Sequence, residues 1–586
     1  MFEYIADGGC MDCREMILSD DFYDILADYP VSLAEEGLSE IPHCFLELSG
    51  GFRILYIDRR EARPLSVARY RYAYIPKCYG LLQPGDLAKE LGAAQIAGVQ
   101  LGGAYEESGI AAVQRPPLSL SGGNILIGFI DTGVRYWLDE FVREDGSSKI
   151  YSIWDQTQQN GSSPEGLLYG TEYTQNQINA SLERRRSGQE DGLTHRDEEG
   201  HGTGMVSVAL RAAPGAEAVM VKCRQAKPHL KEFYGIAPGA ECFAESDIMA
   251  AIRYLQQVAE KAARPMVLCF TMGTNMGDHK GNSLLNRYLE QFGNEKSRCV
   301  VIGGGNEGNQ AHHYRGELMA EGQEQPDLLY EDVEVRVSDN VRSFSFELWG
   351  EVPGTFTISL RAPDGELAER IPIRYGTERR IPFVYSGTEV YVSYVLVERG
   401  GGSELVFVRF QSPSPGIWTL RVFAEGIFGS ARYNIWLPME RFLAQPVYFL
   451  RPNPYLTMTE PSYSQTAVGQ TYFDWENGSF AVDSGRGEEG TGRDTPALST
   501  AGVDISSVSG LLTGSGVSAA LMAGAAALFM EWAIVRQGDI LLSSVEIRNY
   551  FIRGAERDED EEYPNPVWGY GKMNVEGVFR QLIEQI

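Results

Sequence analysis

The chain has 586 residues, which is too many for one hydrophobic core, so two to four domains are expected. Its 80 acidic residues outnumber its 51 basic ones and give a formal net charge of −29. This charge argues against nucleic acid as a partner, because phosphate recognition depends on basic patches, and it favours a soluble protein.

The first predicted unit is an α+β domain at residues 1–95. Helical spacing covers Ser19–Leu26, and strand-like runs cover Phe45–Leu48 and Ile54–Ile57. The first residues have neither the basic start nor the apolar stretch of a secretory signal, so synthesis in the cytoplasm is predicted.

Eight cysteines are distributed over the chain. Several lie in or beside apolar strand-like runs, where a free thiol packs as a small hydrophobe. Cys10 and Cys13 have the spacing of a redox or metal motif, but neither a second such pair nor a nearby histidine supports that interpretation. The cysteine usage therefore favours a reducing compartment.

Residues 96–320 alternate short apolar runs with helical patterns. Continuous apolar runs of this length indicate strands that are buried on both faces, and the helical spacing at Ser246–Glu260 indicates a helix between them. The pattern predicts a doubly wound parallel sheet whose ligands bind at the carboxyl ends of the strands. The predicted strands are Ile125–Ile130, Val219–Lys222, Val267–Phe270 and Cys299–Ile302.

Residues 321–450 change to short alternating strands separated by Gly, Pro and Asp turns, which predicts a β-sandwich. The α/β pattern resumes in residues 451–586, so the sandwich is predicted to be an insertion into one α/β domain. Its aromatic residues, such as Tyr391, Tyr394 and Trp418, leave glycan or peptide binding open, although alternation predicts that most of them are core.

One apolar run, Val517–Val535, approaches the length that spans a membrane. It contains Glu531 and many Ala and Gly residues, so a buried core helix is predicted instead and no membrane span is expected.

Four short segments carry the chemistry of acyl transfer. Asp131 ends a predicted strand, His201 stands in a Gly-His-Gly-Thr run, and Asn306 closes a glycine-rich strand end. A carboxylate that orients a histidine base, with an amide that donates to an oxyanion, is the set that activates a serine. The fourth segment, 513–520, begins a helix whose N-terminal N–H groups favour negative charge.

An Asp-Thr-Gly run also occurs in aspartic peptidases, and Asp483-Ser484-Gly485 supplies a second, similar run. That alternative needs two similar β-rich lobes, and it leaves His201 and Asn306 without a role. It is therefore disfavoured.

The order Asp, His, Asn, Ser in these contexts resembles the subtilisin-like (S8) serine peptidases. By position, the resemblance implies that Asp131 is the triad acid, His201 the base and Asn306 the oxyanion donor. The nucleophile falls on Gly516, which has no side chain. Ser515 and Ser518 are the candidate substitutes, but a slip of one residue turns a side chain by about 100° at a helix start.

Several further segments are similar to the Csp subtilases of spore germination, namely Gly235–Ala240, Glu245–Ile248, Gly273–Gly277, Gly305–Asn309 and His312–His313. The resemblance implies a prodomain at 1–95, a core split into 96–320 and 451–586, and a jelly-roll insertion at 321–450. It implies no cofactor, and no acidic cluster has convincing metal-ligand spacing.

The resemblance implies a pseudoprotease that regulates germination and keeps its prodomain, whose release is otherwise expected near residues 90–105. Expected partners are an active Csp-type protease, the precursor of a cortex-degrading hydrolase, or a small-molecule germinant, with the protein packaged in the spore. An active serine endopeptidase that uses Ser515 or Ser518 is the alternative.

Overall fold

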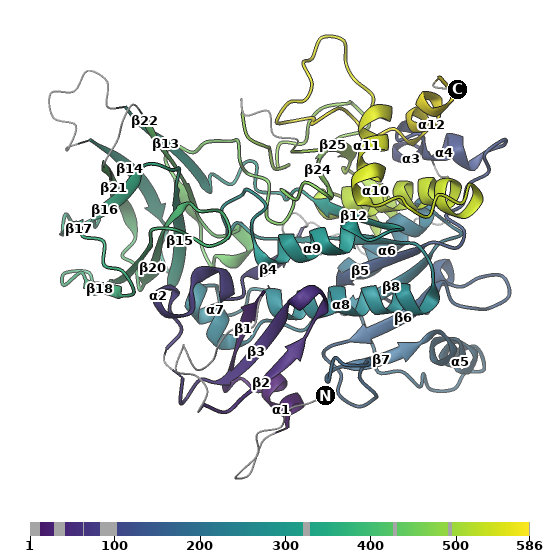
Figure 1. Ribbon diagram of the computed structural model, residues 1–586, viewed down its shortest axis with the longest axis horizontal. Coiled ribbons are helices and arrows are strands. Elements are labelled where there is room, and N and C mark those ends of the chain that lie inside the picture. Colours follow the sequence, from purple (N-terminus) through teal and green to yellow (C-terminus); the bar gives the residue numbers. More distant parts are fainter. Residues whose placement is uncertain are drawn as a thin grey trace.

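The computed structural model describes residues 12–28, 41–62, 64–82, 102–319, 329–425, 430–489 and 495–584. An N-terminal domain packs beneath a central α/β domain, and a domain of two antiparallel sheets lies to one side (Figure 1).

The N-terminal domain is built on a three-stranded antiparallel sheet in the order β1-β3-β2. Its elements are α1 (Cys13–Leu18), β1 (Phe22–Ala27), β2 (His43–Glu47), β3 (Arg53–Asp58), α2 (Val67–Tyr70) and β4 (Cys78–Leu81). The two predicted strands are confirmed as β2 and β3. The predicted helix at Ser19–Leu26 is wrong, because β1 occupies that stretch. All six residues of β1 are buried, so the alternation that marks a strand is lost.

The central domain contains an eight-stranded sheet in the order β25-β24-β12-β10-β5-β8-β6-β7. All its neighbouring strands are parallel except β7, which pairs antiparallel with β6. The strands are β5 (Leu126–Asp131), β6 (Ile150–Asp155), β7 (Thr171–Thr174), β8 (Glu217–Lys222), β10 (Met266–Phe270), β12 (Arg298–Gly303), β24 (Val468–Phe473) and β25 (Leu498–Ala501). The four predicted strands are confirmed within this sheet.

Helices cover both faces of this sheet (Figure 1). On β5, Ile127 and Phe129 pack in the cluster that contains α6 (His201–Ala212) and α10 (Ser515–Met530). Leu126 and Ile130 face the cluster of α8 (Glu245–Ala262) and α9 (Leu284–Asn294). The other helices are α3 (Ala104–Glu107), α4 (Ile110–Gln114), α5 (Gln175–Arg186), α7 (Pro228–Tyr234), α11 (Ser544–Gly554) and α12 (Val575–Glu584).

The apolar run near the C-terminus forms α10 and a following turn of π-helix. Together, Ser515–Arg536 is long and apolar enough to cross a membrane, but 94% of its most apolar window is buried inside the molecule. It contacts α6 and strands β5, β10, β12, β24 and β25, as a central core helix does.

Two antiparallel sheets are inserted between β12 and β24, which are adjacent and parallel in the central sheet. Their orders are β13-β22-β15-β20-β19-β18 and β17-β16-β21-β14-β23, around one shared core. The first strand starts at His313, earlier than the predicted boundary at 321. The strands are β13 (His313–Met319), β14 (Tyr330–Val337), β15 (Ser343–Gly350), β16 (Thr355–Arg361), β17 (Leu367–Ile371), β18 (Glu378–Pro382), β19 (Glu389–Val395), β20 (Glu404–Gln411), β21 (Gly416–Glu425), β22 (Ser430–Trp436) and β23 (Val447–Phe449).

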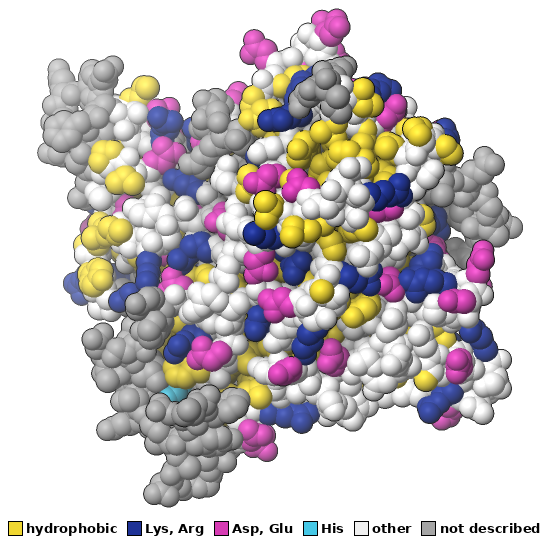
Figure 2. All heavy atoms as spheres, turned by 45° about the vertical axis from the view of Figure 1, so that its right-hand side comes forward, with side chains coloured by type: hydrophobic (Ala, Val, Ile, Leu, Met, Phe, Trp, Pro, Cys, Tyr) yellow, Lys and Arg dark blue, Asp and Glu magenta, His cyan; other side chains and the backbone are white. Residues whose placement is uncertain are grey.

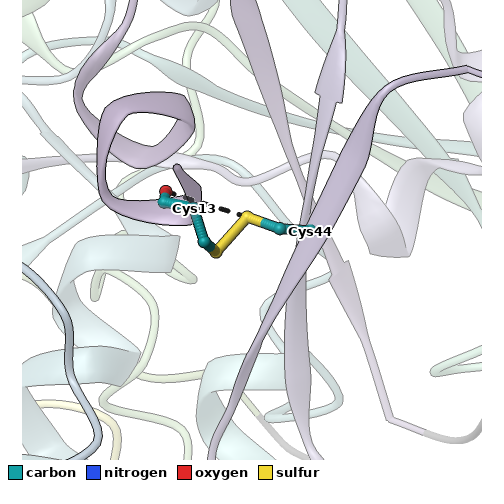
Figure 3. The surroundings of a disulfide bond; sticks show 2 residues. All are labelled: Cys13 and Cys44. Carbon is teal, nitrogen blue, oxygen red and sulfur yellow. Dashed lines mark hydrogen bonds between the residues drawn. A yellow bond between two sulfur atoms is a disulfide. The ribbon is translucent and has the colours of Figure 1, made fainter. Parts of the chain in front are cut away.

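A disulfide joins Cys13 on α1 to Cys44 on β2, with 5.7 Å between their Cα atoms (Figure 3). The sequence analysis favoured free thiols in a reducing compartment and did not predict this disulfide; Cys10 lies outside the described residues. Cys78, Cys223, Cys242, Cys269 and Cys299 are free and buried. On the face in Figure 2, acidic and basic side chains are interspersed.

Candidate active site

The carboxylate at the end of β5 meets the histidine at the start of α6. The His201 Nδ1 atom lies 2.8 Å from Oδ1 and 3.0 Å from Oδ2 of Asp131. Two further donors hold the same carboxylate, the Thr271 hydroxyl at 2.6 Å and the Thr132 N–H at 2.7 Å. Because Nδ1 donates to Asp131, the free lone pair of the ring is on Nε2, the arrangement of a histidine base.

The start of α6 is held by Asp197, a residue that the sequence reasoning missed. Its carboxylate accepts from the N–H groups of Gly200 and Thr203, both at 2.9 Å, and from the Thr203 hydroxyl at 2.6 Å. The Thr132 hydroxyl donates to it at 2.9 Å and thereby ties the end of β5 to this helix. Gly200 has φ +85°, a conformation that favours glycine. An Asp three residues before a Gly-His-Gly run is the signal that would have predicted this cap.

Gly516 faces the same histidine. A Cβ atom built on Gly516 would lie 3.5 Å from the Nε2 atom of His201. Gly514, with φ +131°, precedes the first turn of α10 and sets this approach. Among the residues that the structure describes, Nε2 of His201 has no hydrogen-bond partner. A serine at 516 would therefore project its hydroxyl next to the ring.

Asn306 lies at the same helix start. Its Oδ1 accepts from the Ser515 N–H at 2.9 Å, so the side-chain amide is fixed beside the first turn of α10. The N–H of Gly516 donates at 3.0 Å to the carbonyl oxygen of Leu82. The structure thus brings together the four positions predicted from separate segments, Asp131, His201, Asn306 and Gly516.

The two candidate substitute nucleophiles are engaged elsewhere. The Ser515 hydroxyl accepts from the Gly305 N–H at 3.0 Å, and the Ser518 hydroxyl donates to the Ser515 carbonyl at 2.9 Å. Both side chains are fully buried. Neither hydroxyl is a partner of the histidine base, so neither stands in for the missing one in this conformation.

The space next to these residues is occupied by the chain's own strand β4 and is called the groove below. Strand β4 lies between β11 (Met272–Gly273) and β9 (Phe243–Ala244) as the middle strand of an antiparallel sheet. The next residue, Leu82, donates its N–H to the Thr271 carbonyl at 2.9 Å. The Leu82 carbonyl accepts from the Gly516 N–H, so Leu82 lies against the first turn of α10, next to the position that faces His201.

The junction expected near residues 90–105 lies largely in a stretch that the structure does not describe. The predicted boundary at 95 falls within residues 83–101, outside the described residues. Leu82 itself is buried, and its two methyl carbons lie 2.9 Å from Cβ atoms built on Gly273 and Gly303. The leucine side chain therefore fits a slot whose walls are glycine backbone.

Buried charges fasten the N-terminal domain to the central domain. Asp24 on β1 accepts from the Lys227 ammonium at 2.7 Å and from the Ser246 hydroxyl at 2.9 Å, and Arg224 lies 3.8 Å away. Burial acts to raise the pKa of Asp24, but Lys227 and Arg224 outweigh it and hold that pKa below its ordinary value. Breaking one partner out of this set would leave a buried charge uncompensated.

A second buried carboxyl lies where the three domains meet. Glu347 on β15 accepts from the Tyr72 hydroxyl at 2.6 Å, from the Gly277 N–H at 2.9 Å and from the Trp349 indole at 3.0 Å. Tyr72 belongs to the N-terminal domain and Gly277 to the central domain. Burial raises the pKa of Glu347 to about 7 despite these donors.

Two other motifs do not belong to this site. His195 and Asp155 form a buried pair at 2.7 Å, but the Nε2 atom of His195 already accepts from the Val134 N–H at 3.1 Å, so this ring is structural. Asp483 accepts from the Asn309 amide, and its partners are separate from those of Asp131, contrary to an aspartic peptidase dyad. Within the described ranges, no group of three or more His, Cys, Asp or Glu residues is arranged to hold a metal ion.

Comparison with known proteins finds likeness in structure only. No family model matches the sequence, and no curated protein does. The structure of the Clostridium perfringens CspB protease has a TM-score of 0.71 and 24% identity, and the match covers 82% of this chain and 98% of that chain. The leader-peptide-processing protease EpiP of Staphylococcus aureus has a TM-score of 0.39 and 10% identity, covering 95% and 99%. The chain therefore has the subtilisin-type protease fold of CspB.

Proposed function

We propose that this chain, on its subtilisin-type scaffold, is a Csp-like pseudoprotease that regulates spore germination. In this proposal residues up to Leu82 are a prodomain that stays attached, and the inserted sheets are the jelly-roll domain of that family. Its partners are an active Csp-type protease, the precursor of a cortex-degrading hydrolase, or a small-molecule germinant, and it resides in the spore.

The observation that carries this proposal is the environment of the Nε2 atom of His201. The position facing it, Gly516, has no side chain, whereas the orienting carboxylate of Asp131 is in place at 2.8 Å. Without an attacking oxygen no acyl-enzyme forms; in subtilisin, removal of the serine lowers kcat by about 10⁶. The scaffold and the base are thus retained while the reaction is lost.

The position of Leu82 supports retention of the N-terminal domain. Its carbonyl accepts from the Gly516 N–H, and β4 runs through the groove as a substrate would. A substrate-like segment that is never cut remains a covalent part of the protein. The groove is then filled by the chain's own strand, which suits a protein that acts through binding.

The alternative of an active endopeptidase finds little support. The Ser515 and Ser518 hydroxyls are buried and hydrogen-bonded to backbone groups of Gly305 and Ser515. Either would need a rearranged helix start to reach His201.

The aromatic residues of the inserted sheets do not support binding of a glycan or peptide. Trp418 and Tyr394 are buried, and their polar atoms donate to the carbonyls of Ser414 and Ile371, both at 2.9 Å. Tyr391 is half-buried and donates to Glu389 at 2.8 Å. These rings serve the core and the edge of the sheet.

Intact-mass spectrometry of the purified full-length protein tests the proposal. We expect a single species with the mass of all 586 residues, unchanged over days, and no labelling by a fluorophosphonate probe. A fragment that ends at Leu82, or labelling that is abolished by Ser515→Ala, would establish a working protease and refute the proposal.

A further inference from the structure

An open cavity lies between the end of α11 and the first turns of α12, on the side of the molecule away from the inserted sheets (Figure 1). Its volume is about 400 Å³, which is enough for a small molecule. Three arginines line it, Arg553, Arg557 and Arg580, together with one carboxylate, Glu556. The lining therefore carries a net positive charge in a chain whose net charge is −29, and it attracts anions.

The two helices that form the cavity touch through glycine. A Cβ atom built on Gly577 would overlap the carbonyl oxygen of Gly554, and one built on Gly554 would overlap the backbone nitrogen of Val578. The backbones thus come too close for a side chain at either position. Arg580 lies three residues after Gly577 and so on the same face of α12, and Arg553 directly precedes Gly554. The helix contact fixes where both arginines begin.

Arg557 is held in place without being neutralised. Its Nε atom donates to the Tyr570 carbonyl at 2.8 Å, and its Nη2 atom donates to the Ile552 carbonyl at 2.7 Å. Both acceptors are uncharged, so the guanidinium keeps its full charge, and neither bond uses Nη1. Ile552 belongs to the last turn of α11, where the helix dipole is negative. Arg557 therefore covers the one feature of α11 that would repel an anion.

The other two arginines are still less engaged. Among the described residues, Arg553 has no carboxylate partner. Arg580 donates to Glu576 at 2.7 Å, but both side chains are exposed and a pair of this kind is weak. Within the lining only Glu556 opposes them, and its Oε2 atom lies 3.5 Å from the side-chain amide nitrogen of Asn574.

The surroundings of the cavity narrow the ligand class. Guanidinium groups bind carboxylates and phosphates through paired N–H···O bonds. The positive end of α12 adds to the attraction, since Asn574 and Gly577 at its start both line the cavity. The exposed acidic run Asp558–Glu562 directly follows Arg557 and repels an extended polyanion such as nucleic acid or an anionic membrane. A small anion can contact the arginines without meeting that run.

We propose that the cavity between α11 and α12 binds a small organic anion with two or more carboxylate or phosphate groups, held by Arg553, Arg557 and Arg580. The site is separate from His201 and from the groove. This inference goes beyond the proposed function, because it holds whether or not the chain has lost proteolysis.

Isothermal titration calorimetry of the full-length chain in low salt tests the site, with pyrophosphate and citrate as probes. At least one probe should bind once per chain, with a dissociation constant of about 0.1 mM or tighter. Arg553→Gln and Arg580→Gln should each weaken binding by about ten-fold, because each removes a charged donor. Glu556→Gln should tighten it by about three-fold, because it removes the opposing carboxylate. Tighter binding of pyrophosphate assigns a phosphate-bearing ligand, and tighter binding of citrate assigns a polycarboxylate.

The matched control is Arg336→Gln, at an exposed arginine of β14 in the inserted sheets, and it should leave the affinity unchanged. Hydrogen–deuterium exchange of the β5 amides should match the parent chain in every variant, which shows that the fold is intact. Binding of neither probe, or an affinity that neither Arg553→Gln nor Arg580→Gln lowers, would overturn the inference. Tighter binding of the peptide Asp-Glu-Asp-Glu-Glu than of both probes would also overturn it, since the cavity would then hold a protein segment.

Discussion

Gly516→Ser should restore self-cleavage after Leu82. A Cβ atom at 516 would lie 3.5 Å from the Nε2 atom of His201 and 3.6 Å from the carbonyl carbon of Leu82, so a hydroxyl on it can reach both. Reacting atoms at about 3–3.5 Å are near the geometry of attack. The N–H of residue 516 already donates to the Leu82 oxygen, the donor that would stabilise the developing charge.

The same Cβ would also lie only 2.8 Å from the Leu82 oxygen, so the backbone of Leu82 must shift outward. Crowding of this kind costs about 1–3 kcal/mol, which is about 5- to 150-fold in rate. The serine of subtilisin contributes about 10⁶ in kcat. We therefore expect the variant to cleave about 10⁴- to 10⁵-fold faster than the parent chain.

A time course of intact-mass spectra measures this rate and identifies the bond, with fragments 1–82 and 83–586 expected. Gly516→Ala introduces the same Cβ without a hydroxyl and should show no cleavage. Adding Ser515→Ala to Gly516→Ser should leave the rate unchanged, because the Ser515 hydroxyl is bonded to Gly305. If the serine variant stays whole while its exchange pattern matches the parent, the positioned base inferred from His201 is wrong.

Three further predictions concern the contacts between domains. Glu347 has a pKa of about 7 in the folded protein against 4.5 for an ordinary Glu, so its contribution to stability is full below pH 4.5 and is lost as pH rises towards 7. Glu347→Gln should therefore reduce the fall in the free energy of unfolding between pH 5 and 8 by up to about 3 kcal/mol, measured by urea titration at each pH; an unchanged fall contradicts this. Replacing Cys13 and Cys44 by Ser removes a disulfide between residues 31 apart in the chain and should destabilise the N-terminal domain by about 3–4 kcal/mol. Hydrogen–deuterium exchange of the β3 amides measures this loss, and unaltered exchange would count against it. Lys227→Met leaves the carboxylate of Asp24 buried without its closest cation and should loosen β1 by about 3–5 kcal/mol, whereas an unaffected β1 would mean that Arg224 suffices.

The central fold could be predicted from sequence because its signals are local. Apolar runs such as Val267–Phe270 and Cys299–Ile302 are buried strands in both the pattern and the structure. Since parallel strands end at one edge of a sheet, the predicted convergence of Asp131 and Asn306 followed from their places after such strands. Gly516 was identified by the resemblance of Gly514-Ser515-Gly516 to the nucleophile motif of the subtilisin-like peptidases.

The remaining features depend on contacts between distant segments. Strand β1 is buried on both faces between the N-terminal domain and the central domain, so its pattern imitated a helix. The place of Leu82 depends on how β4 docks between β9 and β11, and no spacing in the sequence encodes that docking. Arg441 reaches the groove only because the inserted sheets return the chain there, 360 residues beyond its partner Leu81.

The covalent continuity of β4 with the groove sets a threshold for any competitor. A tethered ligand acts at an effective concentration of the order of millimolar. A segment of another protein present at about 1 µM must then bind about 10³-fold more tightly than β4 does to occupy half of the grooves. Breaking the buried ion pair between Asp24 on β1 and Lys227 would release the N-terminal domain and lower the affinity that a competitor needs. A regulator that binds the N-terminal domain and separates it from the central domain would therefore open the groove without contacting it.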